Sequence, residues 1–194
     1  MMNKCISKEE LNELPVEAFG GEIIVIDFEN DAKKIISVLK KSIILGFDTE
    51  TKPNFKKGKK NNVALLQLST EKTAFIFRLN KMGLPDCLKE ILADPNIIKA
   101  GVAIKDDILA LKGLSKFKPG GFIELQEKVK DFEIENFGLK KLSGLLLGFR
   151  ISKAQQTSNW EAEHLSDAQL KYAATDAWVS LGIYIKLMEL EQAS

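Results

Sequence analysis

The chain has 194 residues, of which 45% are apolar and 28% are charged, and its formal net charge is +1. This length allows one folded domain with its own hydrophobic core, and the composition excludes a disordered tail or a fibre. The near-zero net charge argues against a generic basic protein that coats nucleic acid. No segment approaches the roughly 20 apolar residues of a membrane-spanning helix, and residues 1–15 lack the apolar core of a signal peptide.

In chain order, the first part of the chain predicts a helix from about residue 8, a strand at 22–27, a helix at 32–40 and strands at 42–47, 63–69 and 73–78. The second part predicts a helix at 84–93, a strand at 97–102, a helix at 104–112 and a strand at 122–125. Three more helices are expected at 126–131, 139–147 and 166–190. Capping boxes at Ser7 and Ser166 predict where the first and last helices begin. This order predicts a single α/β domain over 1–194, with a mixed β-sheet whose first three strands are antiparallel and which is flanked by helices.

The rare residue types restrict the chemistry. Cys5 and Cys87 are too few for a disulfide framework, so we expect a reducing, cytoplasmic setting. His164 is the only histidine, which excludes zinc sites built on two or three histidines and weakens any serine or cysteine triad. Any hydrolytic chemistry must therefore rest on carboxylates.

Asp48 and Glu50 stand two residues apart, directly after the predicted strand at 42–47. Because side chains alternate along a strand, both carboxylates point the same way. Two such groups beside a hydrophobic core repel each other and lose hydration unless a cation neutralises them. The alternative is that both lie in solvent and Glu50 pairs with a lysine of the following loop.

Asp106 and Asp107 fall in the predicted helix at 104–112. Asp107 shares the apolar stripe of this helix with Ile104 and Leu111, whereas Asp106 lies about 100° away and is expected to be solvated. Asp107 is therefore either an inward carboxylate with a partner or a first-turn acid that interacts with the helix dipole.

Tyr172 and Asp176 are four residues apart in the last predicted helix and so share one face. Ala173, Ala174 and Ala177 are small enough to let this face approach another element closely. Taken alone, a tyrosine in such a position is more often a core residue with a satisfied hydroxyl than a catalytic residue.

Together, Asp48, Glu50, Asp107 and Asp176 supply the oxygen ligands that a two-metal site needs. Mg²⁺ and Mn²⁺ prefer such ligands. Two ions about 4 Å apart can hold the attacking hydroxide and the leaving 3′-oxygen of an in-line displacement. The Tyr172 hydroxyl, one turn from a ligand, could orient the attacking water.

Three segments carry these residues, namely 47–51 (FDTET), 100–107 (AGVAIKDD) and 172–177 (YAATDA). They resemble the three motifs of the DEDDy family of 3′-5′ exonucleases, and within it the group of the Werner-syndrome exonuclease domain and ribonuclease D. Ser158-Asn159-Trp160 also matches the segment that precedes the third motif in that group. The similarity spans about residues 40–187, with the N-terminal extension 1–39 expected to pack on this core.

The resemblance implies an RNase H-like exonuclease fold and 3′-5′ exonuclease activity that releases nucleoside monophosphates with two divalent cations, Mg²⁺ or Mn²⁺. By motif position, Asp48, Glu50, Asp107 and Asp176 would bind the cations, and Tyr172 would position the nucleophilic water. Relatives often carry tryptophan after the first motif's glutamate, whereas this chain carries Thr51, so the contact to the terminal nucleotide is expected to differ.

Other residues are candidates for binding nucleic acid, the partner that the motifs imply. Thr49 and Thr51 flank the first motif, and Lys105 and Asn159 accompany the second and third. Phe55, Lys56 and Lys57 lie in a basic loop at 52–62 that either guides the phosphate backbone or is simply solvated. Trp160 is expected to be a core anchor. Neither a membrane nor a particular protein partner is predicted.

Three other functions compete with an exonuclease. A catalytically inactive nucleic-acid-binding module of the same fold is the main alternative, although all five motif residues are present. An aspartyl phosphatase of the haloacid dehalogenase type would need an aspartate where Glu50 stands and leaves Tyr172 unexplained. A role as a protein–protein scaffold would not explain why four acidic residues face inward.

Overall fold

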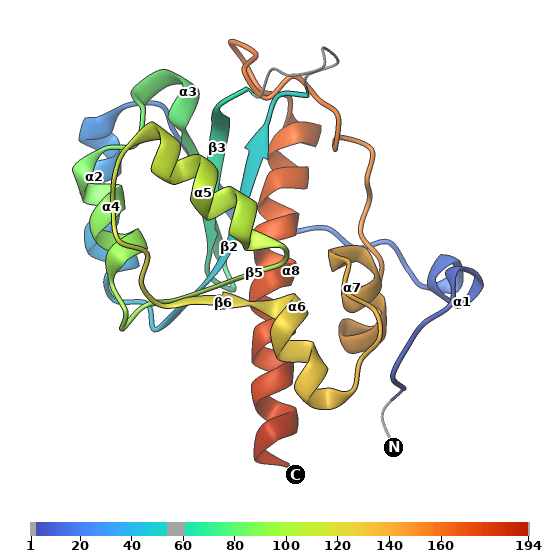
Figure 1. The fold of residues 1–194 in the computed structure, drawn as a ribbon. Helices are drawn as coiled ribbons and strands as arrows, with labels where there is room; N and C mark the ends of the chain where they lie inside the picture. The colour runs from blue at the N-terminus through green and yellow to red at the C-terminus, as the bar shows by residue number, and fades with distance from the viewer. Residues whose placement is uncertain (1–2, 54–60, 194) are drawn as a thin grey trace.

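A six-stranded sheet forms the centre of the computed structural model, which describes residues 3–53 and 61–193 (Figure 1). Its strands are β1 (Glu22–Ile26), β2 (Ile44–Thr51), β3 (Val63–Ser69), β4 (Thr73–Arg78), β5 (Ile98–Gly101) and β6 (Phe122–Glu124). The spatial order is β1-β4-β3-β2-β5-β6. β3 and β4 have the predicted bounds, because each is a short apolar run and a tight turn separates them.

The sheet is mixed, as the order of elements predicts. β2, β3 and β4 form an antiparallel group, whereas β5 and β6 continue the sheet in parallel beyond β2. The first strand in the chain, β1, lies at the opposite edge and pairs in parallel with β4. β2 also extends further than predicted, because Asp48 and Glu50 are part of the strand and pair with β3.

One face of the sheet is covered by α2 (Glu29–Leu39), α4 (Asp86–Ala93) and α5 (Ile104–Leu114) (Figure 1). The strands contribute side chains such as Phe47, Leu66 and Phe77 to this layer, and all three are fully buried. This apolar layer is the largest hydrophobic core of the described residues.

The opposite face is covered by α8 (Asp167–Gln192), with α7 (Leu139–Leu147) and α6 (Leu125–Lys128) beside it (Figure 1). α8 begins at the predicted capping box, in which Ser166 and Gln169 satisfy each other's backbone amides. It runs along the length of the sheet. Its first half lies near the end of β2 that carries the acids, and its second half packs against α7.

The remaining short helices are α1 (Lys8–Glu13), α3 (Leu79–Met82) and the 3₁₀ helix η1 (Val129–Phe132). α1 begins at the predicted capping box of Ser7. The predicted helix at 126–131 is split, because α6 ends at Lys128 and a 3₁₀ turn follows. Val16 forms an isolated parallel bridge with Arg150, so the N-terminal segment lies against the connection between α7 and α8.

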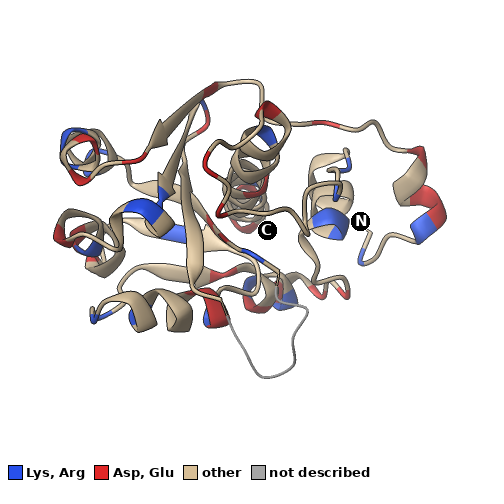
Figure 2. Ribbon diagram, turned by 90° about the horizontal axis from the view of Figure 1, so that it is seen from above, with Lys and Arg blue, Asp and Glu red and all other residues tan. Residues whose placement is uncertain are grey.

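Basic and acidic residues are interspersed along the described helices and loops, as the ribbon view from above shows (Figure 2). This distribution agrees with the near-neutral net charge of the chain. Within residues 3–53 and 61–193, none of the helices has the length and apolar character needed to cross a membrane.

Candidate active site

Strand β2 directs Asp48 and Glu50 toward α8. Gly46 stands two residues earlier on the same face, and a Cβ atom there would lie 1.9 Å from the backbone oxygen of Ala177. Because residues two apart in a strand share a face, Asp48 and Glu50 also point to the side that α8 covers. Gly46 is thus the position that lets the helix approach the strand closely enough to meet these acids.

Helix α8 supplies the third carboxylate, Asp176. Its side chain is only 7% exposed, and Ala173 and Ala177 on the same helix are fully buried. One carboxylate oxygen from each of Asp48, Glu50 and Asp176 lies within 4.8 Å of the others. Residues separated by more than 120 positions in the chain are therefore brought into one cluster.

Burial and like charge raise the pKa values of this cluster. Desolvation is the main cause for each of the three carboxyls, and it raises the pKa of Glu50 to about 9 and that of Asp176 to about 7. The pKa of Asp48 is raised well above its ordinary value, because the charges of Asp176, Glu50 and Asp107 add to its burial. Such a cluster is unfavourable as three bare anions and favourable around a cation.

Asp107 approaches from α5 and is not one of the three clustered acids. Its Oδ1 accepts a hydrogen bond from the Thr49 hydroxyl at 2.5 Å, so Thr49 of β2 is engaged with a carboxylate. Burial raises the pKa of Asp107, and its charge in turn raises the pKa values of Asp48 and Glu50. Asp107 therefore shares the electrostatic environment of the cluster without joining its closest group. Asp106 is exposed, as expected.

The start of α5 is held by a residue that the sequence did not single out. Ala103 precedes the helix in the left-handed conformation, with φ 60°. The Glu124 carboxylate accepts hydrogen bonds from the backbone amides of Ala103 and Ile104 at 2.9 and 2.8 Å. Glu124 thus caps the helix from β6 and orients the first turn, which carries Asp107.

Tyr172 lies one turn before Asp176 and is half-buried. Its ring packs on Trp160, with centroids 5.8 Å apart, and Trp160 is fully buried. The prediction that Trp160 anchors the core is confirmed. Burial and the nearby Asp176 and Glu50 raise the pKa of the Tyr172 hydroxyl, which therefore stays protonated at neutral pH, and this hydroxyl lowers the pKa of Asp176.

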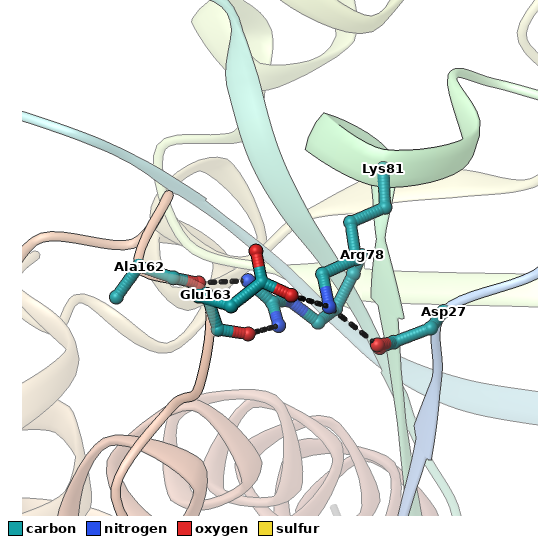
Figure 3. A network of polar contacts seen from close by, with 5 residues as sticks. All are labelled: Asp27, Arg78, Lys81, Ala162 and Glu163. Atoms are coloured by element: carbon teal, nitrogen blue, oxygen red, sulfur yellow. Dashed lines mark hydrogen bonds and ion pairs between the residues drawn. The ribbon is translucent and has the colours of Figure 1, made fainter.

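Arg78 holds the connection that carries Trp160 (Figure 3). Its guanidinium is buried, and it donates hydrogen bonds to the backbone oxygens of Ala162 and of Glu163, the latter at 2.7 Å. Lys81 adds ion pairs to Asp27 at 2.7 Å and to the Glu163 carboxylate at 3.5 Å. These contacts tie residues 162–163 to the end of β4 and so hold Trp160 against Tyr172.

Lys153 is a further residue that the sequence did not indicate. It is exposed on the connection before α8, and its positive charge lowers the pKa of Asp176. No local sequence motif identifies Lys153 as a site residue, because its approach to Asp176 depends on the path of the segment between α7 and α8.

Some of the predicted substrate-binding residues are exposed at the surface, and others lie outside the described residues. Thr51 and Lys105 are exposed. Asn159 is exposed as well, and its side chain accepts a hydrogen bond from the Glu161 amide at 3.3 Å, which braces the connection. Phe55, Lys56 and Lys57 lie outside the described residues. Lys52, at the start of the basic loop, pairs with Glu161 at 3.3 Å.

The donor set fits a hard divalent cation. All the clustered atoms are carboxylate oxygens, and Asp176 Oδ1 is buried without a hydrogen-bond partner among the described residues. Mg²⁺ and Mn²⁺ take such ligands, whereas a zinc site would favour nitrogen or sulfur. His164, the one histidine, is exposed.

A mixed sheet with an antiparallel β2–β4 group, flanked by helices on both faces, is the fold of RNase H-like exonucleases. Solved structures share it. The EXO domain of Nibbler from Aedes aegypti superposes with a TM-score of 0.81 at 24% identity over 92% of this chain and 94% of that domain. RNase D from Escherichia coli superposes with a TM-score of 0.78 at 22% identity over 89% of this chain and 46% of that protein.

The chain belongs to the 3′-5′ exonuclease family, whose sequence model matches residues 23–191. The members of this family are nucleases that act on nucleic acids. A curated relative is the mouse bifunctional 3′-5′ exonuclease/ATP-dependent helicase WRN, which is 34% identical over 96% of this chain. The chain spans only 14% of the length of that relative.

Proposed function

We propose that this protein is a DEDDy-type 3′-5′ exonuclease, which hydrolyses phosphodiester bonds from the 3′ end of nucleic acid with two divalent cations and releases nucleoside monophosphates. The observation that carries the proposal is the meeting of Asp48, Glu50 and Asp176 within 4.8 Å of one another. Membership of the family supports the reaction class. The cations would be Mg²⁺ or Mn²⁺, because the cluster offers oxygen ligands alone.

The chain's own residues have distinct roles in this proposal. Asp48, Glu50 and Asp176 hold the cations, and Asp107, oriented by Thr49, completes the ligand set from α5. When bound, such cations lower the pKa of a water and stabilise negative charge on the attacking and leaving oxygens. The protonated Tyr172 hydroxyl orients the water that attacks phosphorus, and the 3′-oxygen of the preceding nucleotide leaves and takes up a proton.

Substrate contacts are assigned to exposed residues around the cluster. Lys105, in the first turn of α5, and Lys153, whose charge lowers the pKa of Asp176, supply positive charge, and Thr51 and Asn159 supply polar groups. Phe55, Lys56 and Lys57 keep their predicted role as contacts to the phosphate backbone and a base. Thr49 contributes through Asp107, to which its hydroxyl donates.

Digestion of end-labelled oligonucleotides tests the proposal. Matched single-stranded DNA and RNA carrying a 5′ label are incubated with the full chain and Mn²⁺ or Mg²⁺. We expect a ladder that shortens from the 3′ end, nucleoside monophosphates as products, and no cleavage in EDTA. Tyr172→Phe should lower the rate by about 10- to 100-fold, the order expected when a reacting group loses its orientation.

Asp107→Asn and Asp106→Asn form a matched pair for the same assay. Asp107 is half-buried and accepts from Thr49, whereas its neighbour Asp106 is exposed. We expect Asp107→Asn to lose activity and Asp106→Asn to keep it. If the wild-type chain binds the oligonucleotides but leaves them intact with ample Mn²⁺, the protein is instead an inactive nucleic-acid-binding module of the same fold.

A further inference from the structure

Gln67 is a fully buried amide in the middle of β3, a strand that is otherwise apolar up to Ser69. Neither its Nε2 nor its Oε1 has a hydrogen-bond partner among the described residues. Burying an amide without partners is costly, and native proteins rarely retain one without a reason. An apolar side chain of similar size would fill the same space without that cost.

The register of the sheet places Gln67 beside the acid cluster. It lies directly opposite Asp48 in the antiparallel β2–β3 pair, and Ile76 of β4 flanks it on the other side. Directly opposite residues share a face of the sheet, with Cβ atoms about 4.5–5.5 Å apart. Gln67 therefore projects from the same face as Asp48, beneath α8.

β3 and α8, which pack against each other, carry unpaired hydrogen-bonding groups of opposite kinds. The Gln67 amide has two N–H donors that lack acceptors, and Asp176 Oδ1 is a buried acceptor that lacks a donor. Asp48, the cross-strand neighbour of Gln67, belongs to the same carboxylate cluster as Asp176. An amide in this position can reach carboxylate oxygens from the side of the protein interior.

We propose that Gln67 is a positioning residue for the cation-loaded site, where its amide donates hydrogen bonds to the ionised carboxylates of Asp48 and Asp176. The inference rests on the proposed function, because it assigns Gln67 to the ligands of the same cations. Hydrogen bonds to ionised acceptors are stronger than those between neutral groups. Metal-binding carboxylates are usually held by such outer partners, which orient the oxygen that faces the cation.

A direct consequence is that Gln67 acts against the stability of the cation-free fold and in favour of the loaded site. Polar residues that break the rules of core packing concentrate at functional sites for this reason. Replacing Gln67 by methionine, which has a similar shape and no amide, should then separate the two effects. Stability without cations should be kept or raised, while affinity for cations should fall.

The experiment compares wild-type residues 1–194 with the Gln67→Met and Gln67→Leu variants by thermal unfolding in EDTA and across a Mn²⁺ titration. We expect the melting temperature of both variants in EDTA to equal or exceed that of wild type. The Mn²⁺ concentration needed for half of the stabilisation should rise by about 10- to 100-fold, the usual effect of losing an outer partner of a metal ligand. The rate of 3′-end digestion at a fixed Mn²⁺ concentration should fall in both variants.

Ser69→Ala is the matched control. Ser69 is buried two residues further along the same face of β3, opposite Gly46, and its hydroxyl already donates to the Thr70 backbone oxygen at 2.7 Å. This variant should melt at a lower temperature and bind Mn²⁺ as wild type does.

Two results would overturn the inference about Gln67 and leave the proposed function standing. One is wild-type Mn²⁺ affinity and digestion in Gln67→Met. The other is an equal loss of melting temperature in EDTA and in Mn²⁺, which would mean that the amide has a partner within the fold itself. A wild-type chain that neither responds to Mn²⁺ nor shortens oligonucleotides would overturn both proposals together.

Discussion

β2 and β3 carry different chemistry on their two faces. On one face, Phe47 and Leu66 pack into the layer of α2, α4 and α5 and are fully buried. On the other, Asp48 and Gln67 face each other across the strand pair beneath α8. The same backbone hydrogen bonds support both faces. The contrast teaches that the cost of the chemistry falls on the α8 face, where carboxylates and an amide interrupt apolar packing.

Apolar burial and carboxylate burial contribute to the free energy of folding with opposite signs. Apolar burial contributes about 25 cal/mol per Å² removed from water. Burial of like-charged carboxylates costs free energy until a cation compensates them, as the raised pKa values of Asp48, Glu50 and Asp176 indicate. Substitutions on the two faces should therefore differ in their effects. A substitution on the apolar face should lower stability and leave Mn²⁺ binding unchanged, whereas one among the acids should lower activity and keep or raise the stability of the cation-free protein.

Asp176→Asn should show the greatest separation between activity and stability. The amide keeps the shape of the side chain but removes a cation ligand and its charge. We expect exonuclease activity to fall by at least about 10²–10³-fold, the cost of losing one major electrostatic stabiliser. In EDTA at pH 8 the variant should be more stable to urea than wild type, because burial raises the pKa of Asp176 to about 7, so its carboxylate is ionised at pH 8 at a desolvation cost that the neutral amide lacks. Lower stability of this variant would contradict the account of the α8 face.

Phe77→Ala probes the opposite face. Phe77 is fully buried in β4 against the α2–α4–α5 layer. Its loss should lower the free energy of unfolding by about 3–5 kcal/mol, because burial is lost and a cavity remains. The variant that stays folded should bind Mn²⁺ with wild-type affinity. Urea denaturation and Mn²⁺ titration check these two expectations, and weaker Mn²⁺ binding at full folding would break the separation of the faces.

The pH dependence of stability sharpens the comparison further. The unfolded chain releases the protons of Glu50 and Asp176 at ordinary carboxyl pKa values near 4, whereas the folded chain holds them to about 9 and about 7. The folded state thus binds more protons between these limits, so the free energy of unfolding in EDTA should fall as pH rises from about 5 to 9. Saturating Mn²⁺ should flatten or reverse the trend. Melting curves at several pH values measure it, and a metal-free protein that gains stability over this range would contradict the raised pKa values.

Much of the fold was predictable because local pattern determined it. The bounds of β3, β4 and α7 match the prediction, since each is an apolar or amphipathic run with clear turn signals at its ends. The parallel pairing of β1 with β4 was not readable, because register between distant strands leaves no local mark. The long basic loop that contains Lys56 and Lys57 lies outside the described residues, so its role stays a prediction.

The candidate site was predictable to a similar degree. Alternation along β2 and helical spacing in α8 indicated that Asp48, Glu50 and Asp176 would face inward, and the structure brings them together. Asp107 was expected either to have a partner or to interact with the helix dipole, and the structure gives it the Thr49 hydroxyl as a partner. Gln67 and Lys153 were missed, because their proximity to the acids arises from cross-strand register and from the path of a connection.

Anomalous diffraction from crystals soaked in Mn²⁺ tests the central claim most directly. Two peaks about 4 Å apart are expected, the separation of two-metal sites, each bound by carboxylate oxygens of Asp48, Glu50 or Asp176. Soaked crystals of Asp176→Asn should lose at least one peak. Manganese bound elsewhere, or no anomalous signal between β2 and α8 in the wild type, would contradict the account.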